Sequence, residues 1–134
     1  MSTKGRELHG QAAKLRETEQ FIDSLSLSDQ SLFAYDVDGD ELGFSEGIAC
    51  RSITLRVYAN LNNSKRLLTL AKYEMMAAVD LARQSGRGDA LAVPLFQLAN
   101  LQKELGELSE AVATYKEAVE KIESNPPETH IERQ

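Results

Sequence analysis

The chain of 134 residues has few of the residue types on which catalytic and metal-binding sites are usually built. It contains one cysteine, two histidines and three prolines, and it has no tryptophan. A single cysteine excludes an intrachain disulfide framework and is typical of proteins from a reducing compartment. Cys50 has no flanking catalytic motif, and a lone cysteine within a helical pattern usually belongs to the core. We therefore expect no metal, no cofactor and no enzymatic activity.

Basic residues and long apolar runs are also scarce. Lys and Arg number 15 against 21 Asp and Glu, so the formal net charge at pH 7 is −6. Nucleic-acid binding requires a basic surface, which disfavours that class of function. Apolar runs such as 75–79 are far shorter than the roughly 20 residues that a membrane-spanning helix needs, and 1–6 is not followed by the apolar core of a secretory signal. We expect a cytoplasmic protein that binds neither nucleic acid nor membranes.

One acidic segment resembles a calcium-binding loop at first sight. Asp36, Asp38 and Asp40 alternate as the first ligands of an EF-hand do. That motif also requires a glycine after the third acidic ligand and a glutamate at the end of the loop, whereas the chain has Glu41 and Gly47 at these two places. We interpret the segment as an acidic turn that precedes a helix.

What the chain does have is a helical pattern, because apolar and small residues recur every three or four positions along most of its length. The pattern is clearest in two runs separated by Gly106, and glycine adopts the positive φ often found at the end of a helix. Pro126 ends the second run. The first run carries Leu95, Leu98, Ala99, Leu101 and Leu105, and the second carries Leu108, Ala111, Val112, Tyr115, Ala118, Val119 and Ile122. The sequence therefore predicts an antiparallel helical hairpin over 92–126.

An internal repeat indicates that similar hairpins precede this one. The segment Gly39–Gly43 is echoed by Gly88–Ala92, and each contains an aspartate placed to cap the helix that follows, Asp40 in the first and Asp89 in the second. Repetition at this spacing is typical of stacked helical units. Within the middle unit, residues 59–64 are expected to form a loop longer than a tight turn, with Asn63 or Ser64 as the next helix cap. Pro94 is expected to perturb the start of its helix.

The last hairpin resembles a tetratricopeptide repeat (TPR), a family whose repeat of about 34 residues carries the pattern A-x3-F in its second helix. Ala111, Tyr115 and Ala118 match the small, aromatic and small positions of that helix, and Gly106 matches the glycine of the turn before it. The first unit fits less well, because Ser28 stands where the family has an aromatic residue.

The resemblance implies an all-α fold in which three TPR-like hairpins stack into a right-handed superhelix, an α-α superhelix. It places the repeats at about 5–38, 42–85 and 90–125. Together they would form one domain, 1–125, followed by a short flexible tail, 126–134.

TPR domains bind an extended peptide or a partner helix along the concave surface made by the first helix of each repeat, so the resemblance also implies a groove for another protein. The corresponding positions in this chain are His9, Arg16, Ala49, Ile53, Arg56, Val93, Phe96, Asn100 and Lys103. Arg16, Arg56 and Lys103 fall at the same place in successive repeats, and a basic line within an acidic protein would attract an acidic segment. The alternative is that they are solvated cations, which are favourable near helix C-termini.

A second hypothesis for the function is structural. A stack of helical repeats usually ends in a helix that covers the last apolar face, and the pattern shows none after the third repeat. The last helix would then pair with a second copy of the chain. The side chains of this possible homodimer contact are Val112, Tyr115, Val119 and Ile122.

Overall fold

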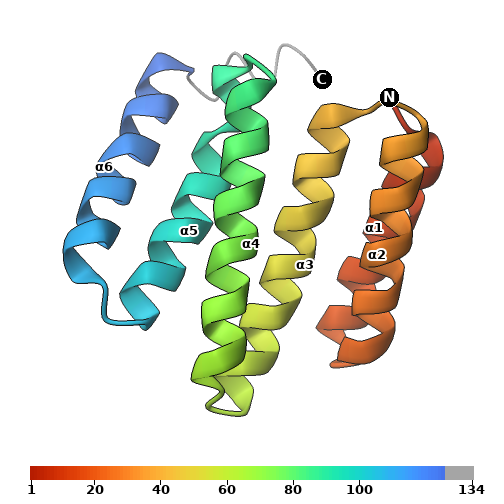
Figure 1. Cartoon of the computed structure of the whole chain (residues 1–134), viewed down its shortest axis with the longest axis horizontal. Helices are drawn as coiled ribbons and strands as arrows, with labels where there is room; N and C mark the ends of the chain where they lie inside the picture. Colours follow the sequence, from red (N-terminus) through yellow and green to blue (C-terminus); the bar gives the residue numbers. More distant parts are fainter. Residues whose placement is uncertain (126–134) are drawn as a thin grey trace.

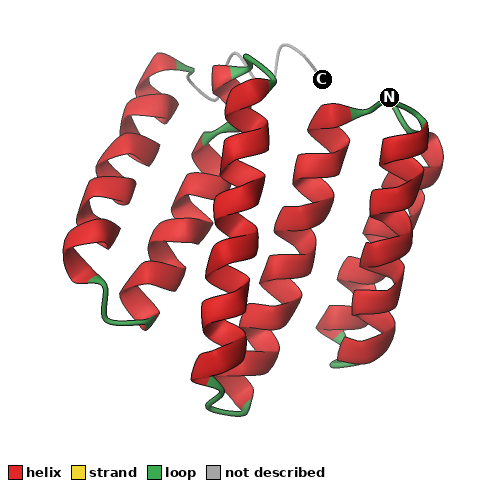
Figure 2. Cartoon of the chain, in the orientation of Figure 1, coloured by secondary structure: helices red, strands yellow, loops and turns green. Residues whose placement is uncertain are grey.

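The structure, a computed structural model, describes residues 1–125, which consist almost entirely of helices and contain no strand (Figure 2). The elements are α1 (Thr3–Glu17), α2 (Phe21–Val37), α3 (Glu41–Leu61), α4 (Lys65–Gln84), the short 3-10 helix η1 (Gly88–Ala90), α5 (Ala92–Glu104) and α6 (Leu108–Ser124). The expectation of an all-α fold is confirmed. The expectation for 126–134 falls outside the described residues.

The helices form three antiparallel hairpins, α1–α2, α3–α4 and α5–α6, which follow one another in a row (Figure 1). Neighbouring hairpins contact each other through α2 and α3 at one junction and through α4 and α5 at the other. In addition, α3 touches both α1 and α5, so the first helices of the hairpins lie side by side in one layer. In Figure 1 this layer lies behind α2 and α4.

Short-range signals in the sequence fix most helix ends. The Asp40 Oδ1 atom accepts a hydrogen bond of 2.9 Å from the backbone N–H of Gly43, and the Ser64 Oγ atom accepts one of 3.2 Å from Leu67. Both side chains satisfy amides that lack an acceptor within the helix. Gly106 adopts a φ of 81° in the turn between α5 and α6. The predicted caps at Asp40 and Ser64 are therefore confirmed.

Three local expectations are wrong. Residues 59–61 continue α3, so the segment expected to be a long loop contributes only the turn 62–64 before α4 begins. Asp89 lies within η1, and α5 begins after Leu91 without a side-chain cap. Pro94 does not disturb α5 because it is only the third residue of that helix, where a backbone N–H would have no helical acceptor.

The main hydrophobic core lies between the second and third hairpins. Leu55, Met75, Leu95 and Leu101 are each at most 5% exposed, and Ala118 of α6 is fully buried beside them. Burial of one such leucine or methionine side chain contributes about 2 kcal/mol to the free energy of folding. The remaining core positions of α4 are mostly alanines, whose small side chains let the neighbouring helices approach closely. This core fixes the orientation of the two hairpins.

The first hairpin packs on α3 in a different way, through small polar side chains. Ser24, Ser28 and Ser31 of α2 are all fully buried. The Ser24 hydroxyl donates to the Ala12 carbonyl at 2.7 Å and lies 3.1 Å from the Thr54 hydroxyl. A buried hydroxyl needs such a partner to offset the loss of water. Ser24 therefore joins α2 to α1 and α3 by hydrogen bonds, whereas the buried Ser28 hydroxyl has no hydrogen-bond partner within residues 1–125.

The largest fully buried side chain among residues 1–125 is Tyr35, at the end of α2. Its ring lies against the backbones of two other helices at Gly5 of α1 and Gly43 of α3. A Cβ atom at Gly5 would lie only 2.6 Å from the Cδ1 atom of the ring, and one at Gly43 would overlap the same edge. Both positions therefore need glycine for space, and Tyr35 joins α1, α2 and α3 at one point.

Asp40 offers a test of this junction. Its carboxylate caps α3 and also accepts a hydrogen bond of 2.9 Å from the backbone N–H of Ser2. The bond from Ser2, followed by that from Gly43, lowers the pKa of Asp40 below its usual value. Because the pKa is lowered in the folded state, the stabilisation is present above the unfolded pKa of about 4 and is lost as the pH falls through the folded value.

We expect Asp40→Ala to lower the free energy of unfolding at pH 7 by about 1 kcal/mol, which is typical of a lost N-cap. The deficit relative to the unaltered protein should shrink as the pH falls through the lowered pKa of Asp40, because the carboxylate of the unaltered protein is then itself protonated. Urea unfolding followed by circular dichroism, at pH 7 and at a pH below the folded pKa of Asp40, measures this deficit in the free energy of unfolding. An equal deficit at the two values would show that the carboxylate charge contributes nothing.

Candidate functional site

A groove of about 570 Å³ opens in the layer of first helices, between α1, α3 and the segment that contains η1 and the start of α5. Of the residues expected in a partner groove, His9, Arg16, Ala49, Ile53 and Val93 line this space. They come from three different hairpins, and the helical period brings them to the same face. The structure thus joins into one cavity side chains that are far apart in the sequence.

Arg16 is the most distinctive group in the groove. Its side chain is half-buried, and its Nη1 atom donates to the Cys50 carbonyl at 3.2 Å and to the Thr54 hydroxyl at 3.3 Å. A guanidinium carries five N–H donors, and the others, on Nε and Nη2, make no hydrogen bond to residues 1–125. All of its partners within that range are uncharged. Arg16 therefore places in the groove a positive charge that has no acidic partner within residues 1–125. Its two hydrogen bonds from Nη1 fix one side of the guanidinium.

The second basic candidate from α1, His9, contributes no charge at neutral pH. Its Nδ1 atom lies 3.2 Å from the hydroxyl of Tyr35, and burial lowers the pKa of the imidazole below 6.5. Nearby, Glu46 forms an ion pair of 2.8 Å with Arg6. The carboxylate and the guanidinium largely neutralise each other, so Arg16 dominates the electrostatics of this end of the groove.

The opposite end of the groove is formed by residues that sequence analysis missed. Arg87 and Asp89 form an ion pair of 2.9 Å at η1, and both line the cavity. Sequence analysis assigned Asp89 only to a helix cap, and Arg87 precedes the repeated segment Gly88–Ala92. No helical period covers this segment, so the pattern gave no signal for its place beside α3.

The other expected groove residues lie outside the cavity. Arg56 forms an ion pair with Glu104 of α5 at 2.7 Å and also donates to Gln97, so its charge serves the contact between two hairpins. Phe96 packs against the ring of Tyr115, with centroids 6.2 Å apart, and Asn100 accepts a hydrogen bond from the Tyr115 hydroxyl.

Lys103 is exposed and has no ion-pair partner within the described range. Since Arg56 is neutralised by Glu104, the expected basic line of three repeats is interrupted in the middle.

The side chains expected to mediate self-association divide into two groups. Val112, Val119 and Ile122 are 54%, 45% and 37% exposed on α6, and Leu108, at 62%, extends the same strip. Tyr115 differs, because its hydroxyl is engaged by Asn100 within the hairpin. The structure therefore leaves an apolar strip on α6, of which Tyr115 is not a free member.

Within residues 1–125, no three His, Cys, Asp or Glu side chains cluster as metal ligands would. Cys50 is a free thiol, only 5% exposed. None of the described helices has the length and apolar character needed to cross a membrane.

The fold and the groove define an all-α protein built from helical hairpins, with a mixed polar and apolar cavity on the layer of first helices. Comparison of the chain with family models, curated proteins and solved structures gives no match.

Proposed function

We propose that the chain is a protein–protein interaction module of the TPR type, whose hairpins stack in a right-handed superhelix and whose groove binds an acidic segment of another protein. The observation that carries the proposal is the half-buried Arg16, which lines the groove and has only uncharged partners within residues 1–125. An anion that binds a positively charged group in a partly desolvated cavity gains more binding free energy than it would at an exposed position.

The apolar part of the groove supports a peptide as the source of that anion. Ala49, Ile53 and Val93 line the cavity, and Val93 is 70% exposed. A carboxylate at Arg16 would thus have apolar contact surface beside it, which suits an aspartate or glutamate next to an aliphatic residue. The carboxylates of the groove, Glu46 and Asp89, are paired with Arg6 and Arg87, which limits their repulsion of an acidic ligand.

Selection of binding sequences from a random peptide-display library tests this function directly, since the library samples acidic, basic and apolar segments alike. Against the unaltered protein, we expect enrichment of Asp or Glu beside aliphatic residues. The same sequences should fail to bind Arg16→Gln, which keeps a hydrogen-bonding side chain and removes the charge.

The matched control for this selection is Arg66→Gln, the same chemical change at an exposed position in the first turn of α4. It should leave binding unchanged. Enrichment of sequences without acidic residues, or equal retention by both variants, would contradict the proposed site.

Self-association through α6 is the second candidate function. It is favoured by the exposed strip of Leu108, Val112, Val119 and Ile122, because an apolar strip on the last helix is a typical contact surface. We expect light scattering over a range of concentrations to show a dimer that Val119→Lys dissociates. A mass that stays monomeric at every concentration would rule this function out.

A further inference from the structure

A second groove lies between the ends of α2 and α4, on the layer opposite the first helices. It has a volume of about 340 Å³, its lining includes Phe44 of α3, and Leu81 and Gln84 of α4 form one wall. Asp36 of α2 and Glu41 of α3 line its other side. This cavity shares no lining residue with the groove that contains Arg16.

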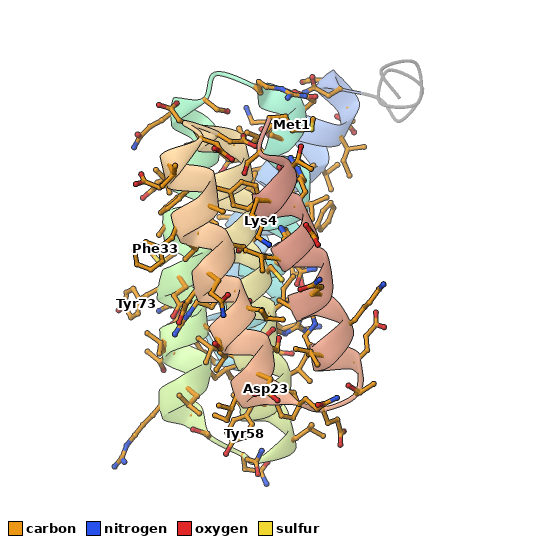
Figure 3. The ribbon with its side chains drawn as sticks, turned by 90° about the vertical axis from the view of Figure 1, so that its right-hand side faces the viewer. Met1, Lys4, Asp23, Phe33, Tyr58 and Tyr73 are labelled. Carbon is orange, nitrogen blue, oxygen red and sulfur yellow. The ribbon has the colours of Figure 1, made fainter. Side chains whose placement is uncertain are left out.

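Large apolar side chains are exposed on α2 and α4, the two helices whose ends form the second groove. Phe33 and Val37 of α2 are 75% and 83% exposed, and Tyr73 and Met76 of α4 are 57% and 39% exposed. Figure 3 shows Phe33 and Tyr73 projecting from the same edge of the molecule at similar height. Exposed aromatic residues gathered on one surface are typical of a contact site rather than of a solvated helix face.

An ion-pair bridge links α2 to α4 through α3, about two helical turns before the groove residues of both helices. Arg51 of α3 donates to Asp29 of α2 at 2.9 Å and to Glu74 of α4 at 2.5 Å. Phe33 follows Asp29 by one helical turn, and Tyr73 precedes Glu74 directly. The bridge therefore connects the two helices that carry the aromatic residues and uses the charge of Arg51 within the protein.

The charged residues that line the groove itself are acidic. The carboxylates of Asp36 and Glu41 make no hydrogen bond or ion pair with residues 1–125, whereas Asp40 is held by Ser2 and Gly43 and lies near the charged N-terminus. The nearby cations of α4 have acidic partners, since Lys72 pairs with Glu107 and Arg83 with Glu117, and the Lys72 Nζ atom also lies 4.6 Å from the centroid of the Tyr73 ring. Arg66 is in the first turn of α4, at the far end from the groove.

We propose that this surface docks a basic amphipathic helix of a partner protein. The exposed apolar side chains on α2 and α4 would contact the apolar face of that helix, and Asp36 and Glu41 would pair with its lysines or arginines. A helix that binds between two helices makes its contacts through apolar residues spaced by three and four positions. Phe33 and Val37 on α2 are four positions apart, and Tyr73 and Met76 on α4 are three apart. Because the carboxylates of Asp36 and Glu41 are negative, the polar face of the partner helix should be basic.

Charge argues against a second copy of this chain as the occupant. The chain has a net charge of −6. The exposed strip on α6 is the apolar helix face that a second copy would present, and it is flanked by more acidic than basic residues. These are Glu110, Glu117, Glu120 and Glu123 against Lys116 and Lys121. Docking of α6 into an acidic groove would place like charges together.

The test uses a fluorescein-labelled helical peptide of about 18 residues, five turns, with leucine on one face and lysine on the other, and a counterpart in which glutamate replaces lysine. By fluorescence anisotropy, the lysine peptide should bind the unaltered protein and the glutamate peptide should not. Phe33→Lys and Tyr73→Lys should each weaken binding of the lysine peptide by about tenfold or more.

Leu61→Lys at the end of α3 is the control, because it adds the same charge to an apolar position that is 57% exposed and lies outside every proposed site, and it should leave the affinity within about twofold. If all three variants weaken binding of the lysine peptide equally, the peptide is attracted to the acidic protein as a whole, and the proposal is overturned. A dimer that dissociates in Phe33→Lys would overturn it in favour of a second copy. Arg16→Gln should not affect the lysine peptide, so failure here is distinguishable from failure of the proposed function.

Discussion

Valine in place of Gly43 is expected to lower the free energy of unfolding by about 3 kcal/mol, the upper part of the range for overpacking a core. The new Cβ atom would overlap the ring of Tyr35, which is fully buried and cannot move into solvent. It would also lie 2.6 Å from the Asp40 carboxylate that caps α3. The ring would have to leave its place between α1 and α3, so the packing of the first hairpin on α3 should weaken at this end.

The control for Gly43→Val is Gly10→Ala, for which the opposite sign is expected. Gly10 is exposed within α1, and a Cβ atom there would meet nothing within 4 Å. Alanine should therefore stabilise the protein by up to about 1 kcal/mol through its higher helix propensity. Urea unfolding followed by circular dichroism measures both variants. A Gly43→Val protein as stable as the unaltered one would show that the Tyr35 contact does not hold the first hairpin.

Truncation of Leu95 to alanine is expected to cost about 3 kcal/mol, within the range for a leucine that leaves a cavity in a well-packed core. Leu95 is 1% exposed and belongs to the cluster that joins α3, α4 and α5. The neighbouring truncation, Val93→Ala, is on the same helix but at a position that is 70% exposed. It should change the stability by no more than about 0.5 kcal/mol.

Thermal or urea unfolding of the two α5 variants gives the comparison directly. Near-equal destabilisation would mean that the third hairpin is not fixed by the core between α4 and α5. It would also weaken the case for the groove with Arg16, because α5 supplies one of its walls through Val93 and Pro94.

The parts of the fold that the sequence predicts best depend on local chemistry. Leu95, Leu98 and Leu101 follow the helical period and are buried, and Gly106 takes the positive φ of the turn after them. Asp40 caps α3 because a cap needs only a carboxylate three residues before an unpaired amide. These features depend on residues a few positions apart, which a pattern can show.

The packing of the first hairpin could not be predicted because it depends on contacts between distant residues. Tyr35 fits between Gly5 and Gly43 only once three helices are assembled, and nothing in the local pattern connects these positions. The extension of α3 over 59–61 was missed for a related reason. Asparagine favours helix ends, but here the helix continues past Asn60 because Ala59 is buried against the core.

The candidate groove, like the fold, was predictable from the sequence only in part. Arg16, Ala49 and Ile53, which the resemblance to TPR placed in a groove, line one cavity. Electrostatics were not predictable, because Arg56 finds Glu104 through long side chains that bridge two hairpins. That ion pair removes the middle of the expected basic line and leaves Arg16 as a groove cation without an acidic partner among residues 1–125.

The most direct measurement is a calorimetric titration of one display-selected acidic peptide into the unaltered protein and into Arg16→Gln, with matching circular dichroism spectra. Since a hydrogen bond to a charged group contributes about 1.5–3 kcal/mol, we expect the variant to bind at least about tenfold more weakly. Arg66→Gln should bind like the unaltered protein. Equal affinity for all three proteins would contradict the assignment of Arg16 as the group that binds an acidic partner.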